Sequence, residues 1–291
     1  MSMGRRDAVR VMAAGACAAG ATAGATPRAV VQPEEVHGHR GPLKQSICRW
    51  CYGGMELREL CRVGAELGYA SVELLGEADW PVVREFGLTC AVANGPVSIG
   101  GGSNTPDSRD RFVSDTESLL PKVRDAGIPN LIVFSGNRRE GLDDEQGLVN
   151  CAAALERVLP AAERAGVTII MELLNSRVDH GGYMCDRTPW GVRLCERLGS
   201  ESFRLLYDIY HMQIMEGDVI RTIRDNARWI AHYHTGGVPG RREIDEGQEL
   251  YYPAICRAIV ETGYNGFLGQ EFIPSREAVG SLRQAHGICN V

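Results

Sequence analysis

The chain has 291 residues, of which 44% are hydrophobic and 23% are charged, and its formal net charge is −6 at pH 7. This is the composition of an ordinary globular protein. The acidic balance and the lack of a basic block argue against nucleic acid, so we predict no nucleic-acid partner. A chain of this length could hold two domains, but a barrel of this size is commonly one.

The first 25 residues are expected to lie outside the folded domain and to direct export. Arg5 and Arg6 precede a weakly apolar run of small residues, Val11 to Ala25, that contains Ala-x-Ala sites. This arrangement resembles a twin-arginine export signal and predicts a periplasmic protein. The alternative is a cytoplasmic protein with a disordered N-terminus. The run is too short and too rich in Gly and Ala for a stable membrane span.

Residues 26–44 predict a linker, because they are polar and contain Pro27, Pro33 and Pro42. From residue 45 to residue 291 the pattern alternates between strand and helix. Strands are expected at residues 46–50, 71–75, 88–93, 130–135, 167–173, 203–208, 229–234 and 266–272. Helices are expected at residues 55–67, 80–86, 107–126, 144–165, 189–198, 218–226, 250–262 and 276–288. This alternation predicts one (β/α)8 TIM barrel, whose active site lies at the C-terminal ends of the strands.

Four of the expected strands end in a side chain that can bind a metal. Any one of these residues alone would be explained as a hydrogen-bonded carboxylate or histidine. Burial of a charge without a partner is costly, and four such residues in the same topological position indicate one metal site. Three carboxylates and one imidazole form a mostly hard donor set, which suits Mn²⁺ or Mg²⁺. The four residues are Glu172, Asp208, His234 and Glu271.

Seven motifs spread over the expected barrel are long and specific: residues 48–52 (CRWCY), 71–76 (SVELLG), 134–138 (FSGNR), 171–176 (MELLNS), 207–213 (YDIYHMQ), 232–241 (HYHTGGVPGR) and 270–272 (QEF). Together they resemble the hydroxypyruvate isomerase branch of the xylose-isomerase-like barrel superfamily. The resemblance implies that Glu172, Asp208, His234 and Glu271 bind one divalent metal ion. Some hydroxypyruvate isomerases carry Gln at the place of His234, whereas ketose 3-epimerases carry His.

The donor set leaves coordination positions free for the carbonyl and hydroxyl oxygens of a substrate. A metal ion there would acidify the intervening C–H and stabilise an enediolate. Glu172 and Glu271 are the expected catalytic acid–base pair. We therefore predict isomerisation of hydroxypyruvate to tartronate semialdehyde, with a ketose 3-epimerase or another sugar isomerase as the alternative.

Further polar residues in the motifs are candidates for binding substrate. His211 would donate a hydrogen bond to a substrate oxygen, unless it is a core histidine. Arg241 follows a Gly-Gly-Val-Pro-Gly loop and would bind a substrate carboxylate, unless it is a surface arginine. Glu73 would line the pocket or form a structural salt bridge. The candidates for the pocket rim are Asn175, His180 and Tyr183.

Other classes of protein fit less well. An endonuclease of the same superfamily would need more metal ligands and a basic surface, and a sugar-binding protein without catalysis would leave the four ligands unexplained. The expected partner is a small hydroxy-keto acid or sugar, and a homo-oligomer is left open. The ten cysteines are expected to be mainly free thiols, because a barrel has a large core of its own.

Overall fold

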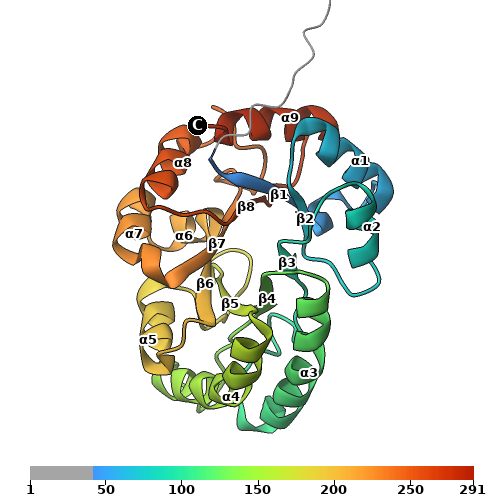
Figure 1. Ribbon diagram of the computed structural model, residues 1–291. Coiled ribbons are helices and arrows are strands. Elements are labelled where there is room, and N and C mark those ends of the chain that lie inside the picture. Colours follow the sequence, from blue (N-terminus) through green and yellow to red (C-terminus); the bar gives the residue numbers. More distant parts are fainter. Residues whose placement is uncertain (1–41) are drawn as a thin grey trace, which may run out of the picture. The chain divides into compact units, whose positions relative to one another are not determined.

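Eight parallel strands form a barrel in residues 42–291, which are the residues that the computed structural model describes (Figure 1). The predicted export signal and the predicted linker up to residue 41 lie outside the described residues. The strands are β1 (Lys44–Cys48), β2 (Ser71–Glu73), β3 (Val92–Ala93), β4 (Asn130–Val133), β5 (Thr168–Leu173), β6 (Phe203–Asp208), β7 (Ile230–Thr235) and β8 (Phe267–Gln270).

The strands hydrogen-bond in the order β2-β1-β8-β7-β6-β5-β4-β3. β2 and β3 stand at the two ends of this order, and they are joined by isolated parallel bridges between Ser71 and Thr89 and between Leu75 and Ala93. The barrel is therefore nearly closed, and the predicted (β/α)8 fold is confirmed.

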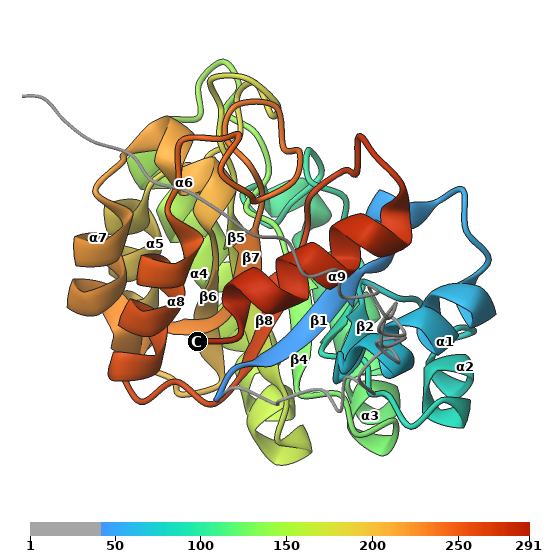
Figure 2. The ribbon, with the colours of Figure 1, turned by 90° about the horizontal axis from the view of Figure 1, so that it is seen from above.

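Helices surround the barrel and connect successive strands (Figures 1 and 2). The glycines that follow α1 and α4, Gly68 and Gly166, adopt left-handed φ angles of 88° and 65°, which a residue without Cβ adopts readily. The helices are α1 (Leu57–Leu67), α2 (Trp80–Glu85), α3 (Pro106–Asp125), α4 (Asp144–Ala165), α5 (Thr188–Leu198), α6 (Ile209–Met215), α7 (Val219–Asn226), α8 (Tyr252–Glu261) and α9 (Ala278–Cys289), with 3-10 turns at Arg49–Tyr52 and Ala227–Trp229.

Several segments differ from the sequence-based prediction. The strand expected at residues 88–93 is only Val92–Ala93, and the strand expected at residues 71–75 ends at Glu73. Helix α6 was not expected, because it is short and carries buried residues on most of its surface, so it has no amphipathic period to recognise. The first strand was expected to reach Trp50, but β1 ends at Cys48 and the chain turns into the 3-10 segment. Trp50 is thereby released from the sheet at the end of the barrel where the site lies.

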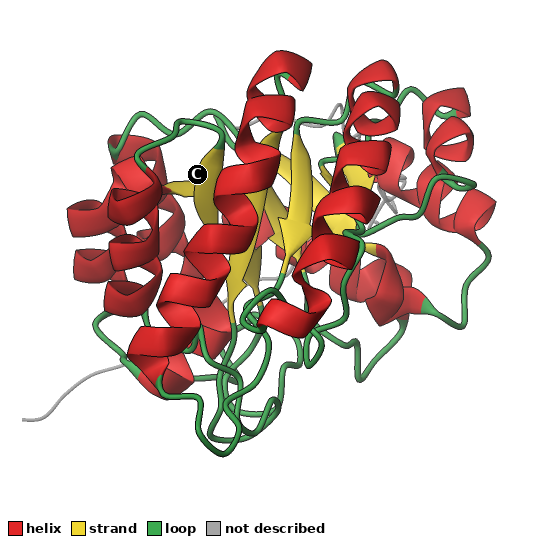
Figure 3. Ribbon diagram, turned by 90° about the horizontal axis from the view of Figure 1, so that it is seen from below, coloured by secondary structure: helices red, strands yellow, loops and turns green. Residues whose placement is uncertain are grey.

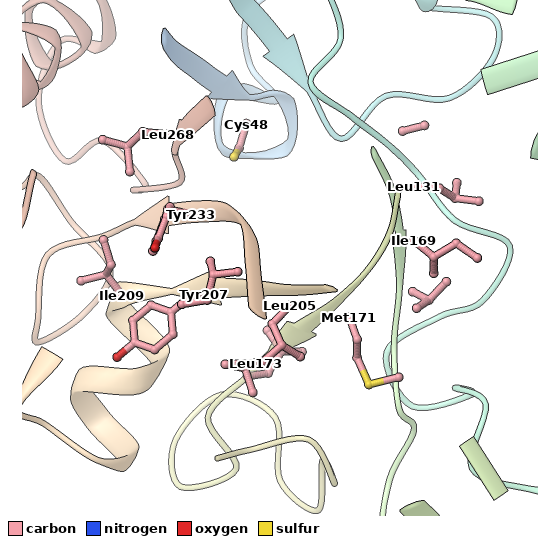
Figure 4. Close-up of a cluster of buried hydrophobic side chains, with 14 of the residues drawn as sticks. Cys48, Leu131, Ile169, Met171, Leu173, Leu205, Tyr207, Ile209, Tyr233 and Leu268 are labelled. Atoms are coloured by element: carbon pink, nitrogen blue, oxygen red, sulfur yellow. The ribbon is translucent and has the colours of Figure 1, made fainter. Parts of the chain in front are cut away.

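Alternation along the strands separates the packing residues from the site residues. On β5 and β6, Met171, Leu173 and Tyr207 belong to the large core between sheet and helices (Figure 4), whereas Glu172 and Asp208 point to the opposite face. A smaller apolar cluster that includes Ile132, Ile170 and Leu206 fills the barrel interior. The site residues therefore lie at one end of a packed barrel.

Long loops gather at one end of the barrel (Figure 3).

Within the described part of the chain, no helix combines the length and the apolar character needed to cross a membrane. All nine cysteines among the described residues are buried free thiols, as expected for most of the ten.

Candidate active site

The structure brings together the four residues that the sequence selected as metal ligands. Glu172 lies on β5, Asp208 ends β6, His234 lies on β7 and Glu271 follows β8. Each offers one ligand atom, and these four atoms all lie within 4.8 Å of one another. Each of the four residues is at most 4% exposed. They form one buried cluster at the C-terminal ends of adjacent strands.

The two ring nitrogens of His234 face different groups. Nδ1 lies 2.9 Å from Glu271 Oε2 and 3.2 Å from Glu172 Oε1, inside the cluster. Nε2 lies 2.8 Å from Glu73 Oε1, on the other side of the ring. The nitrogen available to an ion held by the carboxylates is therefore Nδ1.

The cluster carries three buried carboxylates, and the Arg241 guanidinium binds two of them, Asp208 and Glu271. Burial and the neighbouring Glu271 raise the pKa of Glu172 above its ordinary value. Burial also raises the pKa of Asp208 well above its ordinary value, although Arg241 opposes this. For Glu271 burial acts in the same direction, but the charges of Arg241 and His234 outweigh it and hold the pKa well below its ordinary value. The hard oxygen donors and the excess of acidic groups fit a divalent cation.

Arg241 lies inside the site and is only 8% exposed, so it is not a surface arginine. Its Nη2 donates to Asp208 Oδ2 at 2.8 Å and also to Glu271 Oε2, and its Nε donates to the Glu271 carbonyl oxygen at 3.1 Å. The guanidinium also lies over the Tyr210 ring, 4.9 Å from the centroid. Arg241 has a φ of 55°, a left-handed conformation that a non-glycine residue adopts only when its surroundings stabilise it.

His211 lies beside Arg241 on the cavity wall. Its Nε2 is 2.7 Å from Arg241 Nη1, and its Nδ1 is 2.6 Å from the amide nitrogen of Asn175. Burial, and next the charge of Arg241, hold the pKa of His211 well below its ordinary value, so the ring is neutral. A guanidinium can only donate, so Nε2 of the neutral ring accepts from Arg241 in this arrangement and would have to leave Arg241 to bind a substrate oxygen.

Three of the candidate pocket residues do not line the cavity. Asn175 is fully buried, and its Oδ1 accepts from the backbone of Val178 and Asp179, so it shapes the loop and supports His211. The Tyr183 hydroxyl donates to the Glu172 carbonyl oxygen at 2.9 Å, which is a structural role. Glu73 lies behind His234, as the salt-bridge alternative required.

Glu73 is fully buried and accepts hydrogen bonds through one oxygen. Its Oε1 lies 2.9 Å from His232 Nε2 and 2.8 Å from His234 Nε2. Burial alone would raise the pKa of Glu73, but the two imidazoles outweigh it and hold the pKa well below its ordinary value. Glu73 is therefore an ionised carboxylate between two histidines.

A cavity of about 390 Å³ opens above the cluster. Its polar lining residues include Glu172, His180, His211, Arg241 and Glu271, and the rest of the lining is largely apolar. The apolar lining residues include Leu74, Ile99, Ile132, Phe134 and Leu174. This volume falls in the range of small-molecule sites.

Trp50 is a site residue that the sequence reasoning missed. It is 48% exposed and lines the cavity, and its Nε1 donates to Glu271 Oε1 at 2.6 Å. The position falls within one of the motifs that carry the family resemblance. Its role was hidden because Trp50 was assigned to the first strand, where it would have packed in the sheet.

Named relatives of this chain are isomerases. The chain is 38% identical to a 2-oxo-tetronate isomerase of Cupriavidus necator over 114 residues, which cover 39% of this chain and 43% of that protein. It is 25% identical to a putative hydroxypyruvate isomerase of Homo sapiens over 241 residues, which cover 76% of this chain and 85% of that protein. These relatives confirm the prediction that the chain is an isomerase-type enzyme.

Solved structures share the fold. A family 2 AP endonuclease from Brucella melitensis superposes with a TM-score of 0.73 at 24% identity, covering 82% of this chain and 97% of that chain. A D-psicose 3-epimerase from Clostridium cellulolyticum H10 superposes with a TM-score of 0.66 at 20% identity, covering 84% of this chain and 90% of that chain. The model of the xylose isomerase-like TIM barrel family matches residues 61–286, and this chain belongs to that family.

Proposed function

We propose that this chain is a metal-dependent isomerase that converts hydroxypyruvate into tartronate semialdehyde (2-hydroxy-3-oxopropanoate) through an enediolate. The observation that carries the proposal is the convergence of Glu172 and Glu271 with Asp208 and His234 beside one cavity. The names of the relatives, hydroxypyruvate isomerase and 2-oxo-tetronate isomerase, support the same class of reaction.

Glu172, Asp208, His234 and Glu271 would hold one divalent ion, with Mn²⁺ or Mg²⁺ favoured by the three carboxylates. When bound, the ion supplies positive charge that acidifies the substrate C–H and stabilises the enediolate. The protein side chains then have to move one proton and hold the substrate.

The isomerisation moves a hydrogen between neighbouring carbons. One glutamate takes the proton from C3 of hydroxypyruvate, and a proton is returned to C2, while the hydroxyl proton passes from O3 to O2. Glu172 on β5 and Glu271, directly after β8, both line the cavity, and β6 and β7 lie between their strands, so either carboxylate can reach a bound substrate. Such a pair is the usual means of general acid–base catalysis.

Arg241 and His211 are suited to bind the rest of the substrate. The Arg241 guanidinium lies on the cavity wall, and four of its five N–H groups are directed at Glu271, Asp208 and His211. The remaining N–H, on Nη1, and the positive charge can bind a carboxylate such as that of hydroxypyruvate. His211 is adjacent to it and would bind a substrate oxygen. The acidic end of the substrate would therefore lie next to Arg241.

The test is proton NMR of hydroxypyruvate in deuterated water with the Mn²⁺-supplemented full chain, after removal of the paramagnetic ion from each quenched sample. We expect the C3 methylene signal to decrease and tartronate semialdehyde to accumulate. Glu216→Gln is a matched control for glutamate-to-glutamine variants of the site. Glu216 does not belong to the cluster and accepts hydrogen bonds from Thr188 at the start of α5. Metal-loaded protein that neither exchanges C3–H nor forms product would rule out the proposal.

Ketose 3-epimerisation is the second candidate, and His234 favours it. Ketose 3-epimerases carry histidine at this ligand position, as the resemblance implies, and the solved D-psicose 3-epimerase shares the fold. Epimerisation would use the same two glutamates on opposite faces of one carbon. Incubation with D-fructose and with D-psicose separates the candidates, because an epimerase interconverts them and a hydroxypyruvate isomerase does not.

We also propose that the chain is exported to the periplasm by the twin-arginine route. The support is Arg5-Arg6 before the small-residue run. Replacing both arginines by lysine should retain the folded protein inside the cell, as fractionation would measure. Normal export of the double variant would contradict this route.

A further inference from the structure

Glu73, His232 and Gly269 form a buried group with His234, which is itself one of the proposed metal ligands. The three charged or titratable residues are all 0% exposed. His232 and His234 are two residues apart on β7, so both side chains point into the barrel. Their rings are edge-to-face, with centroids 5.0 Å apart. None of the four residues lines the cavity, so the group is not a substrate contact.

Glu73 is held in place from two sides. The same oxygen, Oε1, lies within hydrogen-bond distance of Nε2 of both His232 and His234, at 2.9 and 2.8 Å. The Cys48 thiol also donates to it, at 3.4 Å. The second oxygen, Oε2, has no hydrogen-bond partner among the described residues, although it is buried. All the hydrogen bonds of the Glu73 carboxylate thus go through Oε1, and the two histidines fix the position of that oxygen.

This arrangement determines which nitrogen of His234 can bind a metal. A carboxylate only accepts hydrogen bonds, and a neutral imidazole has one N–H and one acceptor nitrogen. With one N–H on Nε2 directed at Glu73, a neutral ring has its lone pair on Nδ1. Nδ1 lies 3.2 and 2.9 Å from carboxylate oxygens of Glu172 and Glu271, so it donates a proton to them until a metal ion takes the place of that proton. Histidines that bind metals commonly donate their other N–H to such a carboxylate.

Gly269 provides the space for the Glu73–His234 hydrogen bond. It pairs with His234 in the β7–β8 register. A Cβ atom at this position would lie 2.5 Å from Glu73 Oε1 and 2.7 Å from His234 Cδ2. Both distances are too short for real contacts, so any larger residue would push the two side chains apart. The backbone of β8 is thus adapted to this hydrogen bond.

We propose that Glu73 is a positioning residue of the metal site, which fixes His234 with its N–H on Nε2 and Nδ1 towards the ion, and that Gly269 is required for this contact. The inference rests on the proposed function in so far as it assumes a metal ion in the cluster. It assigns Glu73 no contact with the substrate.

The test measures metal binding and the state of the His234 ring, without turnover. Glu73→Leu removes the acceptor, Glu73→Gln retains an acceptor oxygen without the charge, and Gly269→Ala displaces the pair without changing charge. We expect Glu73→Leu to weaken Mn²⁺ binding, measured by calorimetry, by about ten- to a hundredfold. Glu73→Gln should lie between this variant and the wild type, and Glu216→Gln should bind like the wild type.

Nitrogen-15 NMR of the imidazole gives the second readout. In the wild type with Mg²⁺, Nε2 of His234 should carry the proton and Nδ1 should shift on metal addition. Equal Mn²⁺ affinity of Glu73→Leu and wild type, or a metal-induced shift at Nε2, would overturn the inference. Wild-type protein that binds neither ion would overturn it too. If Glu73→Leu does not fold, the Mn²⁺ affinity of Gly269→Ala and the wild-type NMR pattern still test whether Glu73 positions His234.

The proposed function fails separately from this inference. Wild-type protein that binds Mn²⁺ with the expected ring pattern, yet converts no substrate, would remove hydroxypyruvate isomerisation and leave the role of Glu73 intact. A merely structural role for Glu73 predicts a lower unfolding temperature with unchanged Mn²⁺ affinity. That result would also reject the inference.

Discussion

Glu172→Gln and Glu271→Gln should not behave alike, because the two carboxylates have different partners. Glu172 Oε1 contacts His234 Nδ1 at 3.2 Å. Glu271 Oε1 accepts from Trp50 Nε1 at 2.6 Å, and its Oε2 accepts from Arg241. A glutamine at position 271 has to turn its NH₂ group towards one of these two donors. One hydrogen bond to a charged group is then lost, at a cost of about 1.5–3 kcal/mol.

The two variants therefore share one loss and differ in another. Removing a general acid–base group lowers turnover by about 10²- to 10⁴-fold, which raises the barrier by about 2.7–5.4 kcal/mol. Glu172→Gln should show this loss while retaining most of its metal. Glu271→Gln should in addition lower the free energy of unfolding in urea by about 1.5–3 kcal/mol, because the lost hydrogen bond leaves the Trp50 N–H or one Arg241 N–H without its acceptor.

The assay combines metal analysis, turnover and exchange of the C3 proton of hydroxypyruvate in deuterated water. A variant that exchanges the C3 proton but forms no product has kept the abstracting base and lost the later step. A variant that binds metal and substrate but exchanges nothing has lost the base. If both variants retain metal and near-normal turnover, the two glutamates are not the acid–base pair, and His211 has to be tested in their place.

Three further measurements follow from the structure. Tyr183→Phe removes a buried hydroxyl that joins the Ser135 amide to the Glu172 carbonyl, so the free energy of unfolding in urea should fall by about 1–3 kcal/mol, and an unchanged value would contradict this role. Burial would raise the pKa of Glu243, but hydrogen bonds, that from Ser275 first, lower it to about 2. Because the unfolded chain then binds more protons, stability should fall as pH falls from about 4.5 towards 2, and Glu243→Gln should flatten that slope in acid titrations. Finally, a chelator should lower the unfolding temperature of metal-loaded protein, because an ion at 100 times its dissociation constant stabilises the fold by about 2.7 kcal/mol; an unchanged temperature would argue against a resident ion.

The barrel could be predicted because its signals are local. Each strand is a short apolar run, most of the long helices have one apolar face, and glycines such as Gly68 and Gly166 close helices at the expected places. The proposed ligands Glu172, Asp208 and His234 could be selected for the same reason. Each is a polar residue at the end of an apolar strand, and the fold places all such ends together.

The support of the site could not be predicted, because it depends on contacts between distant strands. Glu73 and His234 are 161 residues apart in the chain, and their hydrogen bond crosses the barrel from β2 to β7. Periodicity along either strand contains no information about the other. The need for glycine at position 269 is likewise visible only when both side chains are in place. The sequence left open whether Arg241 lies on the surface or in the site. The fold of its loop places it in the site.

The spacing of Asp208 and His211 has both a structural and a functional cause. Asp208 is the N-cap of α6, and its Oδ1 accepts from the backbone N–H of His211 at 3.2 Å. A cap of this kind requires a separation of two or three residues, so the Asp-x-x-His spacing is set by the start of a helix. The same turn places the His211 ring 2.7 Å from Arg241, whose guanidinium binds the other Asp208 oxygen. One carboxylate thus ends a strand, starts a helix and joins the proposed metal-binding cluster, which explains why a short helix without amphipathic character is stable there.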